Sequence, residues 1–269
     1  MYEIYLTDFS PGAIAESGQC FRMAAVAHGW TVTAQGRYLE IESGSEPGVF
    51  RFSCAQQEFE TIWRRYFDLE ADYAAYRNKC LKKDKYLRRA CAYGQGLRIL
   101  RQDPWEMLIS FVISQRKSIP AIRRAVEELC RAFGEEHRAG RRIYHAFPSP
   151  TALACAGSRQ LEACGLGYRA KYVHDAACRV AEGRLDLQAL AGRPTPEVQQ
   201  SLMEVYGVGI KVAQCVLLFG YHRLEALPVD VWMDRVIREH YHGKFPRSYQ
   251  DCAGILQQYL FYYARSGQG

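Results

Sequence analysis

The chain has 269 residues, 48% of them hydrophobic and 24% charged, and a formal net charge of +6. These values are ordinary for a soluble globular protein, and the basic balance mildly favours an anionic partner. No apolar run approaches the ~20 residues that a membrane-spanning helix needs, and the N-terminus lacks the order of a secretory signal, so we expect no membrane association and a cytoplasmic location.

The beginning of the chain has the pattern of β-strands. Apolar and polar residues alternate over 30–34 and again over 39–41, with a Gln-Gly turn signal between them, and a further short strand is expected over 49–54. From Gln57 onward the apolar period becomes helical.

The remainder has readable helix starts. Asp103-Pro104-Trp105-Glu106 combines an acidic N-cap, a proline at the first helical position and a glutamate three residues after the cap, which predicts a capping box. Pro120 opens a second helix that ends at Gly134. The pairs 149–150 and 195–196 repeat the cap-plus-proline signal, and Ser248 with Asp251 indicates another cap.

These segments predict an α+β protein in which a small N-terminal antiparallel β-sheet domain packs on a mainly α-helical domain. We place the first domain over residues 1–95 and the second over 96–269. No internal repeat or low-complexity linker separates them, and we expect a monomer.

The ten cysteines are scattered and no two form a C-x-x-C pair. Their spacings fit neither a zinc site nor a four-cysteine iron–sulfur loop, and several lie on apolar helical faces, where a thiol behaves as a small hydrophobe. We interpret them as reduced thiols of a cytosolic protein and predict no metal site.

A glycine hairpin joins two predicted helices at Gly207-Val208-Gly209. Two glycines there permit positive φ and present bare N–H groups at a helix N-terminus, which suits phosphate binding without sequence readout. An ordinary helix–turn–helix connection uses similar glycines, so this motif alone leaves both interpretations open.

Lys211 lies in the first turn of the helix after the hairpin, and Asp230 follows it by 19 residues. The helix dipole opposes a cation at that position and favours the neutral amine, the nucleophile for a Schiff base. A lysine that only pairs with phosphate is the alternative. Asp230 is placed to cap the next helix, and its carboxylate is also suited to stabilise a cationic sugar transition state.

The glycine hairpin, the lysine and Pro228-Val229-Asp230 together resemble the helix–hairpin–helix DNA glycosylase superfamily (HhH-GPD), in which a lysine after the hairpin marks bifunctional members. Other segments resemble one branch, the 8-oxoguanine DNA glycosylases. These segments are 17–22 (SGQCFR), 96–104, 165–172 and 253–261. The likeness runs in consistent order from Ser17 to Phe261.

The resemblance implies a pocket for a flipped base. The carbonyl of Gly18 would accept the proton on N7 of the oxidised guanine, and Gln257 would bond the Watson–Crick edge. Phe261 would stack on one face of the base and Cys215 on the other, although a lone Phe or Cys on a helix is usually core packing. Trp232 would contact the phosphate region or the damaged nucleotide.

The resemblance also implies residues that enter or hold the DNA. Tyr168 would wedge beside the lesion, and Arg169 and the hairpin Gly207–Gly209 would contact the backbone. Arg116 stands where the family has an asparagine that fills the hole left by the flipped base. Gln115 takes that position if the register slips by one residue.

Two further departures separate the chain from eukaryotic members, and the first of them fits a bacterial-type member best. Ala121 occupies a position where eukaryotic members carry an arginine that reads the opposite cytosine, which predicts a relaxed opposite-base preference. Trp232 stands where those members have histidine.

The sequence therefore predicts a bifunctional glycosylase/AP lyase that excises 8-oxoguanine from duplex DNA. Lys211 would attack C1′ with help from Asp230, release the base and leave an imine that permits β-elimination. No metal or organic cofactor is needed, while a monovalent cation at the hairpin carbonyls is compatible with the motif. Two alternatives stay open: a glycosylase for alkylated purines, and a non-catalytic DNA-binding protein.

Overall fold

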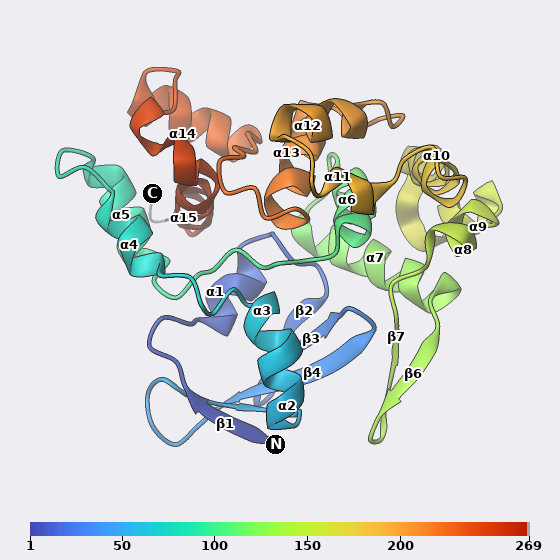
Figure 1. Cartoon of the computed structure of the whole chain (residues 1–269), viewed down its shortest axis with the longest axis horizontal. Coiled ribbons are helices and arrows are strands. Elements are labelled where there is room, and N and C mark those ends of the chain that lie inside the picture. The colour runs from blue at the N-terminus through green and yellow to red at the C-terminus, as the bar shows by residue number, and fades with distance from the viewer. Residues whose placement is uncertain (268–269) are drawn as a thin grey trace.

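A five-stranded antiparallel sheet forms the N-terminal part of the computed structural model, which describes residues 1–267 (Figure 1). Gln35 and Gly36 both have positive φ, 52° and 71°, as a two-residue hairpin turn requires. Burial alternates as predicted over residues 37–43, where Leu39 and Ile41 are fully buried, but not over 30–34, where Val32, Thr33 and Ala34 are all buried. The sheet order is β1 (Tyr2–Tyr5), β5 (Val49–Phe52), β4 (Arg37–Ser43), β3 (Gly29–Ala34) and β2 (Met23–Val26).

Helices make up most of the remaining described chain, which confirms the α+β class. None of the helices within residues 1–267 has both the length and the apolar character needed to cross a lipid bilayer. Those near the sheet are α1 (Pro11–Glu16), α2 (Gln56–Glu58), η1 (Phe59–Trp63) and α3 (Arg64–Tyr66), whereas α4 (Tyr73–Asn78) and α5 (Lys85–Tyr93) pack against the last helix of the chain. Those that follow are α6 (Pro104–Ser114), α7 (Ile119–Phe133), α8 (Pro150–Ala154), α9 (Ser158–Leu161), η2 (Glu162–Leu166), η3 (Gly167–Arg169), α10 (Ala170–Ala181), α11 (Leu187–Leu190), α12 (Thr195–Met203), α13 (Ile210–Phe219), α14 (Val231–Tyr241), η4 (Arg247–Cys252) and α15 (Ala253–Arg265).

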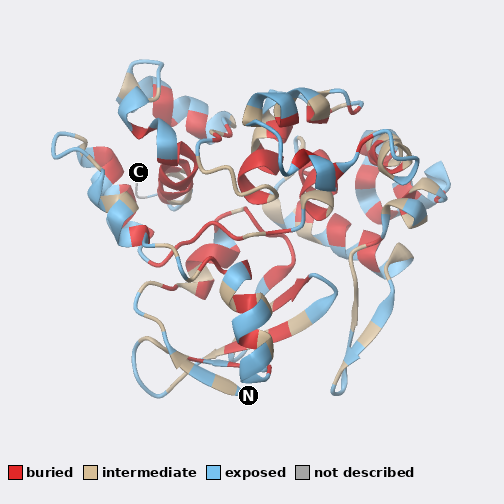
Figure 2. Ribbon diagram, in the orientation of Figure 1, coloured by how far each residue is buried: buried red, intermediate tan, exposed pale blue. Residues whose placement is uncertain are grey.

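The buried residues form two cores, one around the sheet and one among the helices (Figure 2). Buried Gln19 connects them, because its side chain donates to the carbonyl of Arg98 at 2.8 Å and accepts from the N–H of Leu100 at 2.8 Å. Its own carbonyl accepts from Gln102 at 2.9 Å. The loop over residues 17–22 is therefore fixed against the segment that enters the helical part.

A second buried polar group, Asp68, joins the two parts. Its carboxylate accepts from the hydroxyl of Tyr73 at 2.9 Å and from Nε of Arg101 at 2.8 Å, and Nε2 of His222 lies 3.3 Å away. Burial alone would raise the pKa of Asp68, but His222 and Arg101 outweigh it and lower the pKa to about 2. The carboxylate is thus held ionised inside the protein.

The helix starts agree with the sequence prediction in part. Asp103 caps α6 by accepting from the N–H of Glu106 at 2.9 Å, and Ser149 caps α8 in the same way. The predicted capping box is incomplete, because no return bond from the Glu106 side chain to the Asp103 N–H forms in the described chain. Thr195 is no cap, since its hydroxyl donates to Glu225 instead.

The sequence pattern gave no signal for a two-stranded hairpin, β6 (Glu136–Ala139) with β7 (Arg142–His145), which extends from the helical part beside the sheet (Figure 1). Tyr144 stacks on Tyr38 with ring centroids 5.6 Å apart and donates to the carbonyl of Gly36 at 3.1 Å. This contact braces the helical part against the turn between β3 and β4.

Candidate active site and nucleic-acid interface

A cavity of about 430 Å³ lies where the 17–22 loop, α6, α7, α13, α14 and α15 meet. Cationic side chains outnumber the one carboxylate on its wall, so the cavity is suited to an anionic or electron-rich ligand. Its lining residues are Gly18, Phe21, Phe111, Ser114, Gln115, Arg116, Lys117, Ile119, Ile122, Lys211, Asp230, Val231 and Phe261.

Lys211 reaches this cavity from the first turn of α13, where Gly209 is the N-cap. Its Nζ lies 5.3 Å from the centroid of the Phe111 ring. Phe111 is itself fixed by stacking on Phe219 and by an edge contact with Phe21, at 5.4 and 5.5 Å between centroids. The amine is therefore placed over a rigid aromatic surface instead of moving freely in solvent.

Asp230 has the predicted capping role. Its Oδ1 accepts from the N–H groups of Trp232 at 3.1 Å and Met233 at 2.9 Å at the start of α14. Within residues 1–267 it forms no ion pair with Lys211, although both line the same cavity. Two backbone donors thus fix the carboxylate on the wall of the cavity that the amine also lines.

Gly18 and Phe261 lie next to each other on the cavity wall. Gly18 has φ +75°, and a Cβ on it would lie 3.2 Å from Cε1 of Phe261 and 3.0 Å from Cδ1 of Ile119. Any side chain at this position would thus be strained and would enter the space between the backbone and the aromatic ring. The structure brings Gly18, Lys211, Asp230 and Phe261 together as the sequence indicated.

Three other predicted pocket residues do not reach the cavity wall. Cys215 and Gln257 are 2% and 3% exposed and lie behind it, and the Gln257 side chain accepts a bond from Gln258 at 3.0 Å. Burial raises the pKa of the Cys215 thiol, and the nearby charge of Lys211 opposes that shift. Trp232 lies outside on the surface, 39% exposed.

The connection between α6 and α7 carries both residues that we expect to fill the hole left in the DNA by the flipped base. Gln115 is half-buried, and Arg116 is exposed with φ +51°, a left-handed conformation that asparagine adopts far more readily than arginine. Arg169 holds this segment in place, because its Nε donates to the carbonyl of Gln115 at 2.8 Å. Arg116 is thus presented to solvent on a constrained turn.

The predicted backbone contact of Arg169 does not fit this arrangement. The residue is 6% exposed, and its guanidinium donates to the carbonyls of Gln115, Arg116 and Leu166. It is a buried support for the turn. Tyr168, its neighbour, is 49% exposed with the Arg169 guanidinium 4.3 Å from its ring centroid.

The three residues of the glycine hairpin have different roles. Gly207 has φ +82°, and a Cβ there would lie 2.5 Å from the ring of Tyr172, so only glycine fits. The predicted DNA contact of Val208 does not fit, because its side chain is buried and its N–H donates to Val205 within the turn. Gly209 is exposed at the start of α13.

The sequence interpretation missed several residues of the site. Phe21 and Phe111 line the cavity but read as ordinary apolar positions. Lys117 also lines it, and burial together with the charge of Arg169 lowers the pKa of its amine. The signal that could have found Lys117 was its place directly after Arg116, the residue predicted to fill the hole left by the flipped base.

A further unpredicted feature is an aromatic cluster beside the hairpin. Tyr172 makes edge contacts with exposed Tyr168 and Tyr206, at 5.8 and 4.9 Å between centroids. The Nζ of Lys171 lies 5.5 and 5.4 Å from the rings of Tyr172 and Tyr206. Aromatic faces next to a cation suit contact with nucleic acid.

Two family models match adjoining parts of the chain, which together span residues 1–256. Residues 1–108 match the 8-oxoguanine DNA glycosylase, N-terminal domain, and residues 109–256 match the HhH-GPD superfamily of base excision DNA repair proteins.

Three known proteins are similar over most of their length. A probable N-glycosylase/DNA lyase of Methanothermobacter thermautotrophicus is 30% identical, over 86% of this chain and 84% of its own. The structure of MBOgg1 in complex with a low-affinity DNA ligand superposes with a TM-score of 0.92 at 35% identity, covering 99% and 96% of the two chains. Clostridium acetobutylicum 8-oxoguanine glycosylase/lyase, bound to DNA with cytosine opposite 8-oxoguanine, gives 0.89 at 29% identity and covers 100% and 99%.

Proposed function

The chain belongs to the 8-oxoguanine DNA glycosylase/lyase family, within the HhH-GPD superfamily, and from this premise we propose how its own residues act on duplex DNA. Lys211 is the nucleophile, Asp230 stabilises the charge that develops on the sugar, and Gly18 and Phe261 receive the flipped base. The observation that carries the proposal is that these residues, from four separate parts of the chain, line one cavity.

In the first step Nζ of Lys211 attacks C1′ of the damaged nucleotide as the bond from C1′ to the base breaks. The electron pair of that bond leaves with the base, and the positive charge on the sugar lies opposite the carboxylate of Asp230. The two cap hydrogen bonds keep this carboxylate in place at no cost in reorganisation when the charge appears. Loss of a proton from the amine and opening of the sugar ring then give an imine.

The imine is the basis of the lyase step. It withdraws electrons from C2′, so a proton can leave that carbon while the bond from C3′ to the 3′ phosphate breaks. Water then hydrolyses the imine and frees Lys211.

Contacts with the duplex come from the surface around the cavity. We propose that Tyr168 enters beside the lesion and that Arg116, with Gln115 behind it, occupies the space of the flipped base. Arg116 carries five N–H donors, so it can bond whichever base is left unpaired. Together with Ala121, which offers no hydrogen-bonding group to the opposite strand, this supports a relaxed opposite-base preference.

The test is borohydride trapping on a duplex with one 8-oxoguanine, repeated opposite each of the four bases. Lys211→Gln removes the covalent adduct, while the matched variant Lys117→Gln, which changes another amine of the same cavity, keeps it. Similar adduct yields opposite all partners are expected. An adduct that survives Lys211→Gln would assign the nucleophile elsewhere. If a second duplex with one 3-methyladenine loses that base while the 8-oxoguanine duplex stays intact, the activity belongs to alkylated purines instead.

A further inference from the structure

Two cysteines have their sulfur atoms in contact. Both lie away from the cavity, in the sequence and in the fold. Cys80, in the segment between α4 and α5, and Cys91, on α5, have Sγ atoms 3.4 Å apart, and both are reduced. Among the residues that the structure describes, no other two cysteine sulfurs are hydrogen-bonded to each other. The pair is separated by 11 residues in the chain.

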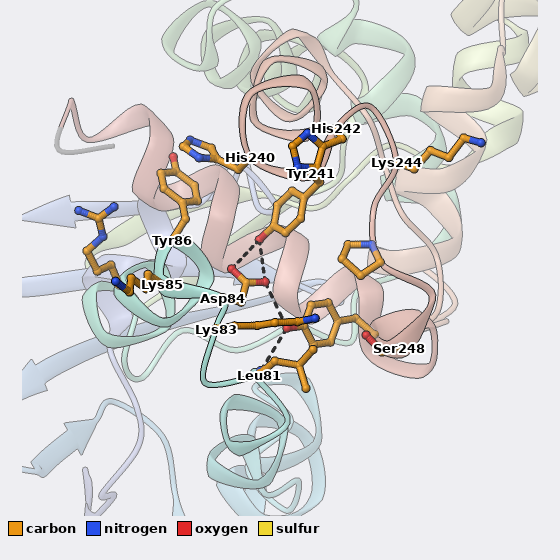
Figure 3. Close-up of a pocket in the computed structure, with 13 residues that line it drawn as sticks. Leu81, Lys83, Asp84, Lys85, Tyr86, His240, Tyr241, His242, Lys244 and Ser248 are labelled. Atoms are coloured by element: carbon orange, nitrogen blue, oxygen red, sulfur yellow. Dashed lines mark hydrogen bonds between the residues drawn. The ribbon is translucent and has the colours of Figure 1, made fainter.

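Hydrogen bonds hold the Cys80 segment in this place. The N–H of Leu81 donates to the hydroxyl of Tyr249 at 3.1 Å, and that hydroxyl in turn donates to Asp84 at 3.1 Å (Figure 3). Tyr241 donates to the same carboxylate at 3.2 Å. These bonds lie on the floor of a separate cavity of about 660 Å³ between α5 and the end of α14. These bonds fix the segment that carries Cys80, so Cys80 stays in place facing Cys91.

The two thiols differ in reactivity. The hydrogen bond from Cys91 lowers the pKa of Cys80, and the positive charges of Arg88 and Arg77 act in the same direction against the effect of burial. Cys91 is buried, and its bond to Cys80 and its burial raise its pKa. Cys80 is half-buried and so reachable from solvent. An accessible, activated thiol next to a second one is the arrangement of a redox-active dithiol.

We infer that Cys80 and Cys91 are a peroxide-reactive modification site that closes to a disulfide. The Cys80 thiolate attacks one oxygen of hydrogen peroxide, the O–O bond breaks, and the other oxygen leaves as water after taking a proton, which makes a sulfenic acid. The sulfur of Cys91 then attacks the sulfur of Cys80 and displaces the hydroxyl as a second water. The two thiols lose two electrons and two protons, and the peroxide is reduced to two waters.

The experiment is peptide mapping of the full chain before and after exposure to hydrogen peroxide, with trypsin and without reductant. Lys82 and Arg89 lie between the two cysteines, so the peptides that hold them stay together only through a disulfide. We expect a joined pair whose mass is two hydrogen atoms below the sum of its parts, and dithiothreitol should separate it. In Cys91→Ser, dimedone should instead label Cys80 as the sulfenic acid.

Cys155 is the reference, since it is exposed and no sulfur lies within hydrogen-bonding distance of it in the described chain. Iodoacetamide should still alkylate Cys155 in the unfolded oxidised protein, but neither member of the pair. Equal alkylation of Cys80, Cys91 and Cys155 after peroxide, or a disulfide between other cysteines, would overturn the inference. The wild-type map decides this by itself, even where the serine variant does not fold.

Discussion

The buried carboxyl of Glu106, on α6, makes the free energy of unfolding depend on pH, and a single neutral substitution should remove that dependence. The side chain is 7% exposed, and burial raises its pKa to about 7 against the opposing charge of Arg22. An unfolded glutamate titrates near its ordinary value of 4.5. Between these values the folded protein holds a proton that the unfolded chain has released, so stability falls as pH rises from 4.5 to 7.

The size of the effect follows from the shift. At about 1.4 kcal/mol for each pKa unit, the full cost above pH 7 is about 3 kcal/mol. Glu106→Gln keeps the shape and stays neutral at all pH values. We therefore expect this variant to be more stable than the wild type by up to about 3 kcal/mol at pH 8 and equal to it at pH 4.5.

Urea unfolding of both proteins across this pH range measures the difference. The exposed Glu162→Gln is the matched control, and its free energy of unfolding should follow the wild type at every pH. A stability difference for Glu106→Gln that is the same at both ends of the range would refute the reasoning, because a buried carboxyl that titrates normally cannot produce the predicted slope.

Other predictions concern the hairpin, the buried carboxylate and the cavity. Gly207→Ala should destabilise the protein by at least ~2 kcal/mol in thermal unfolding, since its Cβ would strike Tyr172, whereas Gly209→Ala meets no neighbour within 4 Å and should be tolerated. Asp68→Asn should lose about 2 kcal/mol in urea unfolding at pH 6, because the lowered pKa stabilises the fold above pH 3.8, and the difference should vanish as pH falls to 2. Gly18→Ala should reduce single-turnover release of 8-oxoguanine by about tenfold or more, roughly 1.4 kcal/mol, and should also lower the melting temperature, because the residue has φ +75°; unchanged release would remove Gly18 from the pocket.

Local patterns predicted the features that depend on neighbours in sequence. The turn at Gln35-Gly36 and the caps at Asp103 and Asp230 were readable because each acts within a few residues. The positions of Lys211 and Asp230 followed from the resemblance, and the structure places both on one cavity wall.

The sequence alone did not predict the features that depend on tertiary packing. Arg169 has the charge of a surface contact, yet two carbonyls of a distant segment, with that of nearby Leu166, bind its guanidinium inside the protein. Phe111 supports the amine only because α6 packs beside α13, and nothing in its own segment distinguishes it from core. The strands β6 and β7 are short and polar, and they gain their order from Tyr38 and Gly36 across the domain boundary.

The side chain of Gln115 donates to the carbonyl of Gly207 at 3.1 Å, so the turn between α6 and α7 is tied directly to the glycine hairpin. If the hairpin holds a phosphate group and the turn enters the base stack, as we propose, this bond sets the spacing between the two contacts. We then expect an insertion in either segment to change the number of nucleotides between the two contact points on the strand.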